Sequence, residues 1–153
     1  MEIIFVCRQN VFRSMSAEYL AKLYAKKNKV TLEISSAGTH ASPDFAYNKT
    51  YEVLSQHGVD VSKIYKNHTQ TKLKHVAHKD AIFICMTKEQ VSIVKELGCK
   101  EVYLFNDIAF HENTNLFDDV ETNSYSDLDV FITQTVNHIA KGIPLIFKNL
   151  TIA

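Results

Sequence analysis

EIIFVCRQNVFRS, residues 2–14, places a continuous apolar run directly before a polar segment and a helix-like pattern. The run at 2–7 has the length and the β-branched and aromatic content of a strand that is covered on both faces. From Ser14 to about Lys27, apolar residues recur at spacings of three and four, which predicts a helix with Ser14 as its candidate N-cap. Residues 8–13 are therefore predicted to form the loop that joins the first strand to the first helix.

The alternation of strand and helix patterns continues along the chain. Three further apolar runs have the length and composition of strands, at 30–36, 81–86 and 101–105. The strand predicted at 30–36 is expected to be closed by a turn at Ala37 and Gly38. Two amphipathic segments are predicted to be helices that end at a glycine, 47–57 before Gly58 and 87–97 before Gly98.

A last helix is predicted after the polar stretch 106–124. Its apolar face consists of Leu128, Phe131, Ile132, Val136, Ile139 and Ile143. Four strands that alternate with helices favour a parallel sheet that is covered on both sides. A chain of 153 residues with 46% apolar content suffices for one core and is too short for two ordinary domains. We therefore expect a single α/β domain over 1–153, a three-layer sandwich with a four-stranded parallel sheet and helices on both faces.

Charge and apolar patterning narrow the class of protein. The 17 basic and 17 acidic residues cancel and form no long block of one sign, so neither nucleic acid nor a membrane is an expected partner. No apolar stretch approaches the about 18 residues of a membrane span, and the N-terminus lacks the pattern of a secretory signal. The 3 cysteines at irregular spacing favour reduced thiols. These patterns predict a cytoplasmic protein, and we expect a monomer or a weak dimer.

The loop after the first strand has the composition of an anion-binding site. In a parallel sheet covered by helices, ligands bind outside the carboxyl ends of the strands, and the first strand-to-helix connection is a favoured place. The N–H groups and positive dipole end of the following helix favour an anion, and the guanidinium of Arg13 suits two phosphate oxygens. The same field favours the thiolate of Cys7, its nucleophilic form. The alternative is a buried, inert Cys7 and a solvated Arg13.

A thiolate that is held against a phosphoryl group can attack phosphorus in line. The product is a phosphocysteine intermediate, which water later hydrolyses. Ser14 follows Arg13 directly, and its hydroxyl is expected to donate a hydrogen bond to the departing sulfur of Cys7. The 7 histidines show no i, i+4 pair with a third ligand, so no metal site is expected. The predicted chemistry is the hydrolysis of phosphate monoesters without a metal or cofactor.

The segment VCRQNVFRSMSAE, residues 6–18, is similar to the phosphate-binding loop of the low-molecular-weight protein tyrosine phosphatases, which usually reads V-C-x-G-N-x-C-R-S-P-x-A-E. SSAGTHA at 35–41 resembles the S-A-G-T segment of the family, and DAIFICMT at 80–87 resembles its third strand. The resemblance implies that Cys7 is the nucleophile and that Asn10 and Ser36 hold the loop. It assigns phosphate binding to Arg8, Gln9, Asn10, Val11, Phe12, Arg13 and Ser14.

The family uses an Asp, normally followed by Pro, as the general acid that protonates the leaving group and later activates water. The present chain has no Asp-Pro dipeptide. Alignment of the last helix by its apolar face places Asp119 at the position of the acid, with Asp118 as the alternative. An arbitrary Asp in a polar loop is more often a turn residue, so this assignment rests on the resemblance.

Several loop positions depart from the family pattern. Gln9 replaces a Gly, and it would be strained if that position required a positive φ. Phe12 replaces a Cys that can protect the nucleophile through a disulfide, and Met15 replaces a Pro. Val11 lies where Ile accompanies phosphotyrosine and Thr accompanies phosphoarginine in the family, so it favours phosphotyrosine. Arg8 is either at the rim of the pocket, where it would favour acidic substrates, or a solvated surface residue.

The resulting hypothesis is a protein tyrosine phosphatase whose partners are phosphotyrosine-containing proteins, a tyrosine kinase or its targets among them. One alternative is a weak or inactive phosphate-binding regulatory module, suggested by Gln9 and the missing Asp-Pro. Arsenate reduction is a less favoured alternative. It would pair Cys85 with a second thiol about seven residues later, but residue 92 is Ser and Cys99 is too distant. Cys85 is therefore expected to be a core residue.

Overall fold

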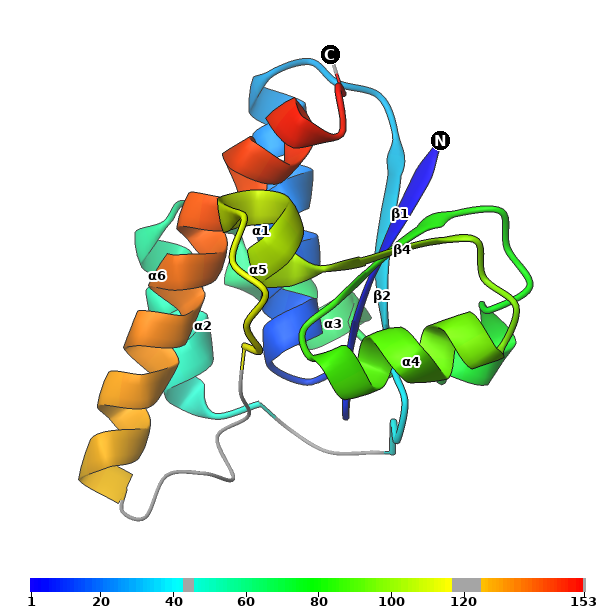
Figure 1. The fold of residues 1–153 in the computed structure, drawn as a ribbon. Coiled ribbons are helices and arrows are strands. Elements are labelled where there is room, and N and C mark those ends of the chain that lie inside the picture. Colours follow the sequence, from blue (N-terminus) through cyan, green and yellow to red (C-terminus); the bar gives the residue numbers. More distant parts are fainter. Residues whose placement is uncertain (43–45, 117–124, 153) are drawn as a thin grey trace.

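A parallel sheet with the strand order β2-β1-β3-β4 forms the middle of the molecule (Figure 1). The structure is a computed structural model and describes residues 1–42, 46–116 and 125–152. The strands are β1 (Glu2–Cys7), β2 (Glu33–Gly38), β3 (Ile82–Cys85) and β4 (Glu101–Leu104). All three neighbouring pairs are parallel, so the carboxyl ends of the strands meet at one edge of the sheet.

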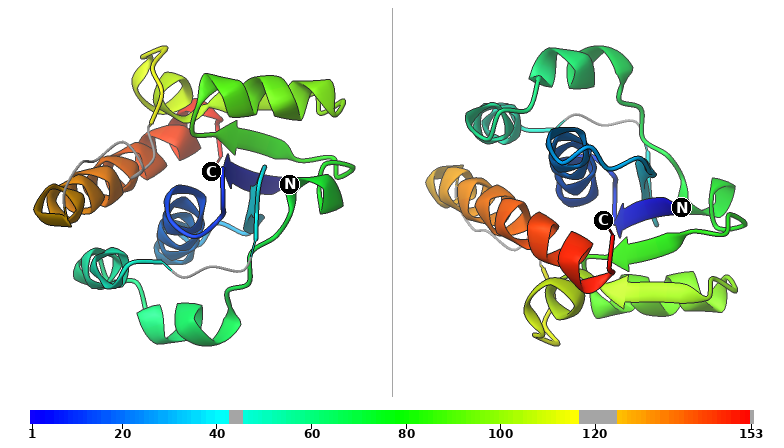
Figure 2. Two further views of the ribbon diagram at one scale, coloured as in Figure 1. Left: turned by 90° about the horizontal axis from the view of Figure 1, so that it is seen from below. Right: turned by 90° about the horizontal axis from the view of Figure 1, so that it is seen from above.

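Helices cover both faces of the sheet, as Figure 2 shows for α1 (blue) on one side and α4 (green) on the other. One layer contains α1 (Arg13–Lys27), α2 (Asn48–Gln56), α5 (Phe105–Phe110) and α6 (Tyr125–Asn149). The short helix α3 (Val61–Asn67) follows α2. The other layer contains α4 (Lys88–Glu96) and a 3-10 turn at Leu73–His75. The predicted α/β sandwich with a four-stranded parallel sheet is therefore confirmed.

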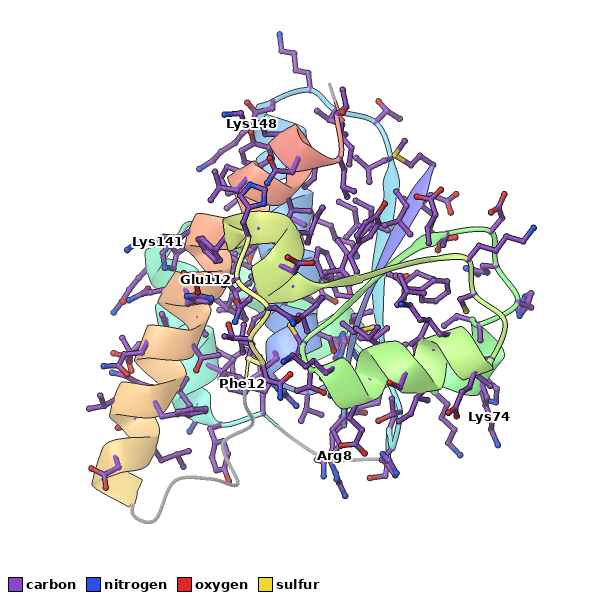
Figure 3. The ribbon with its side chains drawn as sticks, viewed as in Figure 1. Arg8, Phe12, Lys74, Glu112, Lys141 and Lys148 are labelled. Atoms are coloured by element: carbon purple, nitrogen blue, oxygen red, sulfur yellow. The ribbon has the colours of Figure 1, made fainter. Side chains whose placement is uncertain are left out.

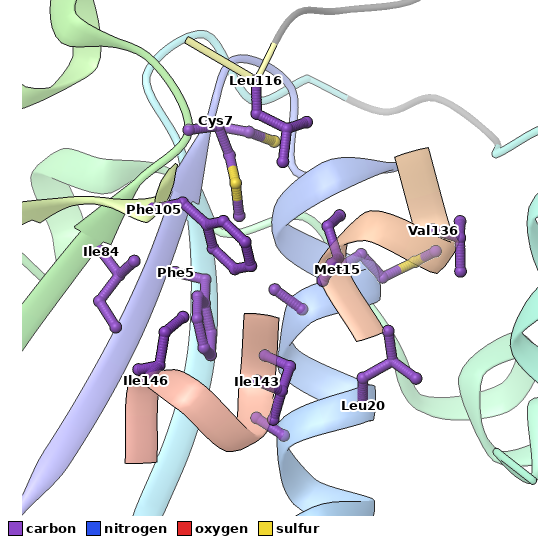
Figure 4. Packing of buried hydrophobic residues seen from close by; sticks show 14 of the residues in the cluster. Phe5, Cys7, Met15, Leu20, Ile84, Phe105, Leu116, Val136, Ile143 and Ile146 are labelled. Carbon is purple, nitrogen blue, oxygen red and sulfur yellow. The ribbon is translucent and has the colours of Figure 1, made fainter. Parts of the chain in front are cut away.

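Alternation along β1 divides the core into two clusters. Ile3, Phe5 and Cys7 face the layer of α1 and α6, whereas Ile4 and Val6 face the layer of α4. Every one of these five side chains is buried, because successive residues of a central strand point to opposite, covered faces. Figure 4 shows the first cluster, with Cys7 at the end of β1.

Helix ends and faces agree with the sequence patterns in several places. Gly58 and Gly98 follow α2 and α4 with φ values of 93° and 91°, the left-handed conformation of a helix-terminating glycine. Thr87 and Gln90 form a capping box at the start of α4. Five residues of the predicted apolar face of α6 are buried: Leu128, Ile132, Val136, Ile139 and Ile143. Phe131 is partly buried against the same cluster. No helix in the described ranges is long and apolar enough to cross a membrane.

Two local predictions were wrong, and two short helices were missed. The second strand begins at Glu33 and includes Gly38, which pairs with Cys7 instead of forming a turn. Ser14 does not cap α1, because the helix already begins at Arg13 and the Ser14 hydroxyl lies beside the Cys7 sulfur. The helices α3 and α5 were not predicted, since each is at most two turns long and carries too few apolar repeats for a periodic signal.

Gly142 lets α6 pack closely against α5. A Cβ atom built at Gly142 would lie 2.7 Å from Cε1 of Phe105, whose side chain is fully buried. We expect Gly142→Ala to lower the free energy of unfolding by about 1–2 kcal/mol, because overpacking outweighs the gain in helix propensity. Urea unfolding measures the loss. In a Phe105→Leu background, which makes room, the same substitution should cost less; an equal cost in both backgrounds would contradict this account.

Candidate active site

Cys7 ends β1 at the carboxyl edge of the sheet, where the loop 8–12 leads into α1. The segment after β2 holds the start of this loop: Thr39 N–H donates to the Cys7 carbonyl (3.0 Å), and His40 N–H donates to the Arg8 carbonyl (2.7 Å). Gly38 permits this close contact, because a Cβ at this position would lie 2.6 Å from the Arg8 carbonyl oxygen. The loop is therefore supported along one side by backbone.

The Cys7 sulfur lies within a network that suits both of its protonation states. Ser14 Oγ lies 2.9 Å from Cys7 Sγ, and the Asn10 N–H donates to the same sulfur at 3.3 Å. The Ser14 hydroxyl also lies 3.4 Å from the Ala37 carbonyl. A thiol can donate to Ser14 Oγ while Ser14 donates to Ala37; when the sulfur is a thiolate, Ser14 can donate to it instead. The network can stabilise a sulfur that gains and loses a proton or a phosphoryl group.

Asn10 is the residue that shapes the loop. It is fully buried and has a φ of 66°, a left-handed conformation that Asn adopts more readily than most residues. Its Nδ2 donates to Ser14 Oγ (2.9 Å) and to Ser36 Oγ (2.7 Å). Gln9 does not have a positive φ, so replacement of the family's Gly by Gln9 causes no backbone strain of that kind. The left-handed position of this loop is occupied by Asn10 itself.

Two residues that sequence reasoning did not assign, His68 and Thr71, also hold Asn10 in place. His68 Nε2 donates to the Asn10 carbonyl (2.9 Å), and Thr71 N–H donates to Asn10 Oδ1 (2.9 Å). Ser36 Oγ donates to Glu18 Oε1. Glu18 Oε2 in turn pairs with Lys22 Nζ at 2.6 Å. Glu18 stands in the motif quoted above, but residues 68 and 71 are about sixty positions from Asn10 and carry no spacing signal.

Tyr19 supports His68 on the side away from the loop. The two rings pack edge to face with centroids 5.8 Å apart, and the Tyr19 hydroxyl lies 3.4 Å from His68 Nδ1. Burial, and then the charge of Glu18, raise the pKa of Tyr19 to about 12. The Tyr19 hydroxyl therefore stays protonated near neutral pH and can donate a hydrogen bond to Nδ1 of His68. This arrangement matches the tautomer in which His68 Nε2 is protonated and donates a hydrogen bond to the Asn10 carbonyl.

Arg13 begins α1 with a buried side chain, of which 2% is exposed. Its Nη1 donates to the Leu116 carbonyl at 2.6 Å, and this uses one of the five N–H donors of the guanidinium. Leu116 is itself held by a hydrogen bond from its N–H to the Met86 carbonyl (2.8 Å). Leu116 and Cys7 lie at the same end of the core (Figure 4). The predicted acids Asp119 and Asp118 lie outside the described residues.

The loop backbone offers hydrogen-bond donors. Within the described part of the chain, the N–H groups of Gln9, Val11 and Phe12 donate to no protein acceptor. Successive N–H groups that converge at a helix N-terminus form an anion-binding concavity. Phe12 is buried and packs against Phe131 of α6, with ring centroids 6.4 Å apart. Phe12 therefore contributes to the core with its side chain, and only its backbone can contribute to anion binding.

The other two cysteines are not arranged as redox partners of Cys7. Cys85 pairs in register with Val6, and its side chain lies in the cluster on the opposite face of the sheet from Cys7. Burial raises the pKa of the Cys85 thiol and that of the Cys99 thiol, which favours the protonated form of both. Across the described ranges, no three His, Cys, Asp or Glu side chains form a cluster that could hold a metal ion.

Oxidation of Cys7 is expected to be irreversible. Phe12 stands where a protecting thiol would be, and Cys85 points away from the loop on the other face. After peroxide treatment, we expect dithiothreitol to restore less than about a tenth of the initial rate of p-nitrophenyl phosphate hydrolysis, because the sulfur proceeds to sulfinic and sulfonic acids. Mass spectrometry of the Cys7 peptide identifies the product. Full recovery through a disulfide to Cys85 or Cys99 would refute the expectation.

Comparisons with known proteins agree with this geometry. The family model described as low molecular weight phosphotyrosine protein phosphatase matches residues 2–118. No curated protein sequence matches the chain. Among solved structures, YwlE arginine phosphatase with a phosphorylated active-site serine has a TM-score of 0.82 at 22% identity, over 99% of this chain and 96% of that one.

Two further solved structures have the same fold. A low molecular weight protein tyrosine phosphatase from Bacillus subtilis has a TM-score of 0.77 at 24% identity, over 99% of this chain and 97% of that one. The Drosophila arginine phosphatase DARP has a TM-score of 0.76 at 16% identity, over 98% of both chains. At these identities the likeness concerns the fold, and the three proteins are named as two arginine phosphatases and one protein tyrosine phosphatase.

Proposed function

The chain belongs to the low molecular weight phosphotyrosine protein phosphatase family, and we propose on this premise that it dephosphorylates phosphotyrosine in proteins through a phosphocysteine intermediate. The surroundings of Cys7 carry this proposal. Its sulfur accepts a hydrogen bond from the Asn10 N–H at 3.3 Å and lies 2.9 Å from the hydroxyl of Ser14, which is in the first turn of α1. A buried cysteine with only a packing role would need neither polar contact.

In the first proposed step the Cys7 thiolate attacks phosphorus in line. A sulfur–phosphorus bond forms, the bond from phosphorus to the tyrosyl oxygen breaks, and the leaving oxygen takes a proton from an acid. Arg13 and the free N–H groups of the loop bind the phosphoryl oxygens, whose charge must be neutralised in the transition state. Asp119 is the proposed acid, with Asp118 as the alternative.

The contact between Leu116 and Arg13 supports the proposal that Asp118 or Asp119 is the acid. The Leu116 carbonyl accepts a hydrogen bond from Arg13, and Asp118 and Asp119 follow two and three residues later. Because consecutive Cα atoms are about 3.8 Å apart, two or three residues span at most about 11 Å from Leu116, and this short separation in sequence supports the proposal. In the second step the same Asp would take a proton from the water that attacks phosphocysteine. Ser14 would donate a hydrogen bond to the departing Cys7 thiolate.

Phosphotyrosine is proposed over phosphoarginine because of Val11, the only loop side chain that bears on this choice. Its apolar, branched side chain is partly buried in the loop and resembles the Ile that accompanies phosphotyrosine in the family. The solved structures of the same fold include both tyrosine and arginine phosphatases, so the fold does not favour either substrate. The alternative of an inactive module is weakened, because Gln9 has no positive φ that would disturb the loop.

Steady-state hydrolysis of three substrates tests the proposal. Near pH 6 we expect turnover of p-nitrophenyl phosphate, and kcat/KM for a phosphotyrosine peptide should exceed that for the matching phosphoarginine peptide at least about tenfold. Replacement of Val11 by Thr should reduce this ratio. A wild-type protein that binds vanadate but hydrolyses none of the substrates would contradict catalysis. Faster hydrolysis of the phosphoarginine peptide would contradict only the substrate assignment.

The two candidate acids are separated by their amide variants. We expect Asp119→Asn to lower kcat for a phosphotyrosine peptide by about 10²–10⁴-fold, the usual contribution of a general acid, and Asp118→Asn to lower it only severalfold. The loss should be smaller for p-nitrophenyl phosphate, whose leaving group needs little protonation. The reverse order of the two variants would transfer the role to Asp118, and no effect of either would remove both from the mechanism.

A further inference from the structure

Arg8 is a cation directly beside the proposed nucleophile. It follows Cys7 in sequence, its side chain is exposed, and it has no ion pair or side-chain hydrogen bond with any described residue. Figure 3 shows Arg8 pointing outward at the end of the molecule where the sheet's carboxyl edge lies. By contrast, Arg13 of the same loop is buried and held by Leu116. An unpaired cation at the mouth of a site is available to a substrate.

His40 lies next to Arg8 because of the backbone. The His40 N–H donates to the Arg8 carbonyl at 2.7 Å, which joins the two residues just beyond the ends of β1 and β2. Thr39 Oγ1 lies 2.9 Å from His40 Nδ1. When the Thr39 hydroxyl donates to Nδ1, the His40 ring carries its proton on Nε2 and offers that N–H as a donor. The imidazole is exposed and therefore accessible to a ligand.

A small hollow with a volume of about 90 Å³ joins these residues to the phosphate loop. Arg8, Arg13, Thr39 and His40 line it from the side of the loop, and Thr87, Glu89 and Gln90 line it from the start of α4. The lining residues thus include two arginines and one acidic residue, Glu89. The hollow has room for one carboxylate or phosphate group, and its cationic excess and N–H donors favour an anion.

We infer that this hollow binds a second anionic group of the substrate, the carboxylate of an acidic residue beside the phosphorylated one, with Arg8 as the principal contact. The inference rests on the proposed function, because Arg13 links the hollow to the phosphate loop. Arg8 and His40 would act as specificity residues that touch the substrate beside the reacting group. Phosphotyrosine in an acidic sequence would be preferred to phosphotyrosine in a neutral or basic one.

The expected preference is moderate and sensitive to salt. One or two partly exposed charge pairs should change Kd by about threefold to tenfold between an acidic and a basic peptide. Raising the salt concentration from about 0.05 M to about 0.5 M should reduce the preference, because exposed charges are screened. Since the contact exists equally before and during the reaction, the preference should appear in KM and not in kcat.

Binding to the Cys7→Ser variant tests the inference without requiring turnover. Fluorescence anisotropy would give Kd for phosphotyrosine peptides that differ only in the neighbouring residue: Glu, Ala, Lys or a second phosphotyrosine. We expect the Glu peptide to bind more tightly than the Ala peptide, and the Lys peptide to bind least tightly. Adding Arg8→Glu should reverse the order, whereas adding Glu89→Gln should strengthen binding of the Glu peptide. Tighter binding of the doubly phosphorylated peptide would identify the second anion as phosphate.

Lys148→Glu is the matched control, because it makes the same charge change on an exposed residue at the opposite end of the molecule (Figure 3). It should leave the order of the peptides unchanged. Equal Kd values for the Glu, Ala and Lys peptides, or an order that Lys148→Glu changes as much as Arg8→Glu, would overturn the inference. Failure of the proposed function would appear separately, as absence of turnover by the wild-type protein.

Discussion

Replacement of Cys7 by serine should lower turnover of p-nitrophenyl phosphate by at least about a thousandfold, because a hydroxyl cannot replace a thiolate as the attacking nucleophile. The fold should survive, since the two side chains have nearly the same shape and the Ser14 and Asn10 contacts remain available. Measured kcat should fall, while the Kd for inorganic phosphate should change much less. Loss of phosphate binding would indicate a collapsed loop instead of a missing nucleophile.

Cys85→Ser is the control for this experiment. It makes the same chemical change in a residue that is fully buried on the other face of the sheet. A buried hydroxyl should lower the free energy of unfolding by about 1–3 kcal/mol without abolishing turnover. Comparable losses of kcat in the two variants would mean that Cys7 has no special role.

The Gly38→Ala substitution should have the second largest effect. Its Cβ would lie 2.6 Å from the Arg8 carbonyl oxygen, 3.0 Å from the Gln9 carbonyl carbon and 3.1 Å from the Asn10 nitrogen. Ordinary contact begins at 3.4 Å, so the backbone of the phosphate loop must move. Because a displacement on the order of 1 Å can cost about 10²-fold in rate, we expect kcat/KM to fall by about that factor.

Gly98→Ala controls for a loss of stability alone. Gly98 has a φ of 91° and no atom within 4 Å of its Cβ position, so alanine would strain the backbone without displacing a neighbour. Both substitutions should lower the free energy of unfolding by about 1–3 kcal/mol, but only Gly38→Ala should lower kcat/KM. Unchanged turnover in Gly38→Ala would mean that the loop tolerates the displacement and that its geometry is not critical.

Strand and helix patterns were sufficient to predict the fold, because β1 and β3 are buried on both faces and read as continuous apolar runs. The glycines after α2 and α4 marked helix ends correctly. The second strand was misplaced, since Gly38 resembles a turn residue in sequence and its role is close contact with the loop. Short helices such as α3 and α5 depend on tertiary contacts and leave little periodic signal.

The candidate site was predictable only where its residues are contiguous in sequence. Residues 7–14 and Ser36 belong to recognisable motifs, and the structure brings Cys7, Asn10, Ser14 and Ser36 together. His68 and Thr71 reach the loop through the tertiary fold, so no local pattern indicates their contacts with Asn10. Gln9 was considered a source of strain because the family pattern has Gly there, but the left-handed residue is Asn10.

Trapping of the covalent intermediate tests the central claim most directly. A reaction of the Asp119→Asn variant with a phosphotyrosine peptide can be stopped with acid within milliseconds and analysed by mass spectrometry. We predict that the protein gains one phosphoryl group and that the peptide containing Cys7 carries it on sulfur. Continued turnover with no phosphorylated protein, or a phosphoryl group on any residue other than Cys7, would contradict the account.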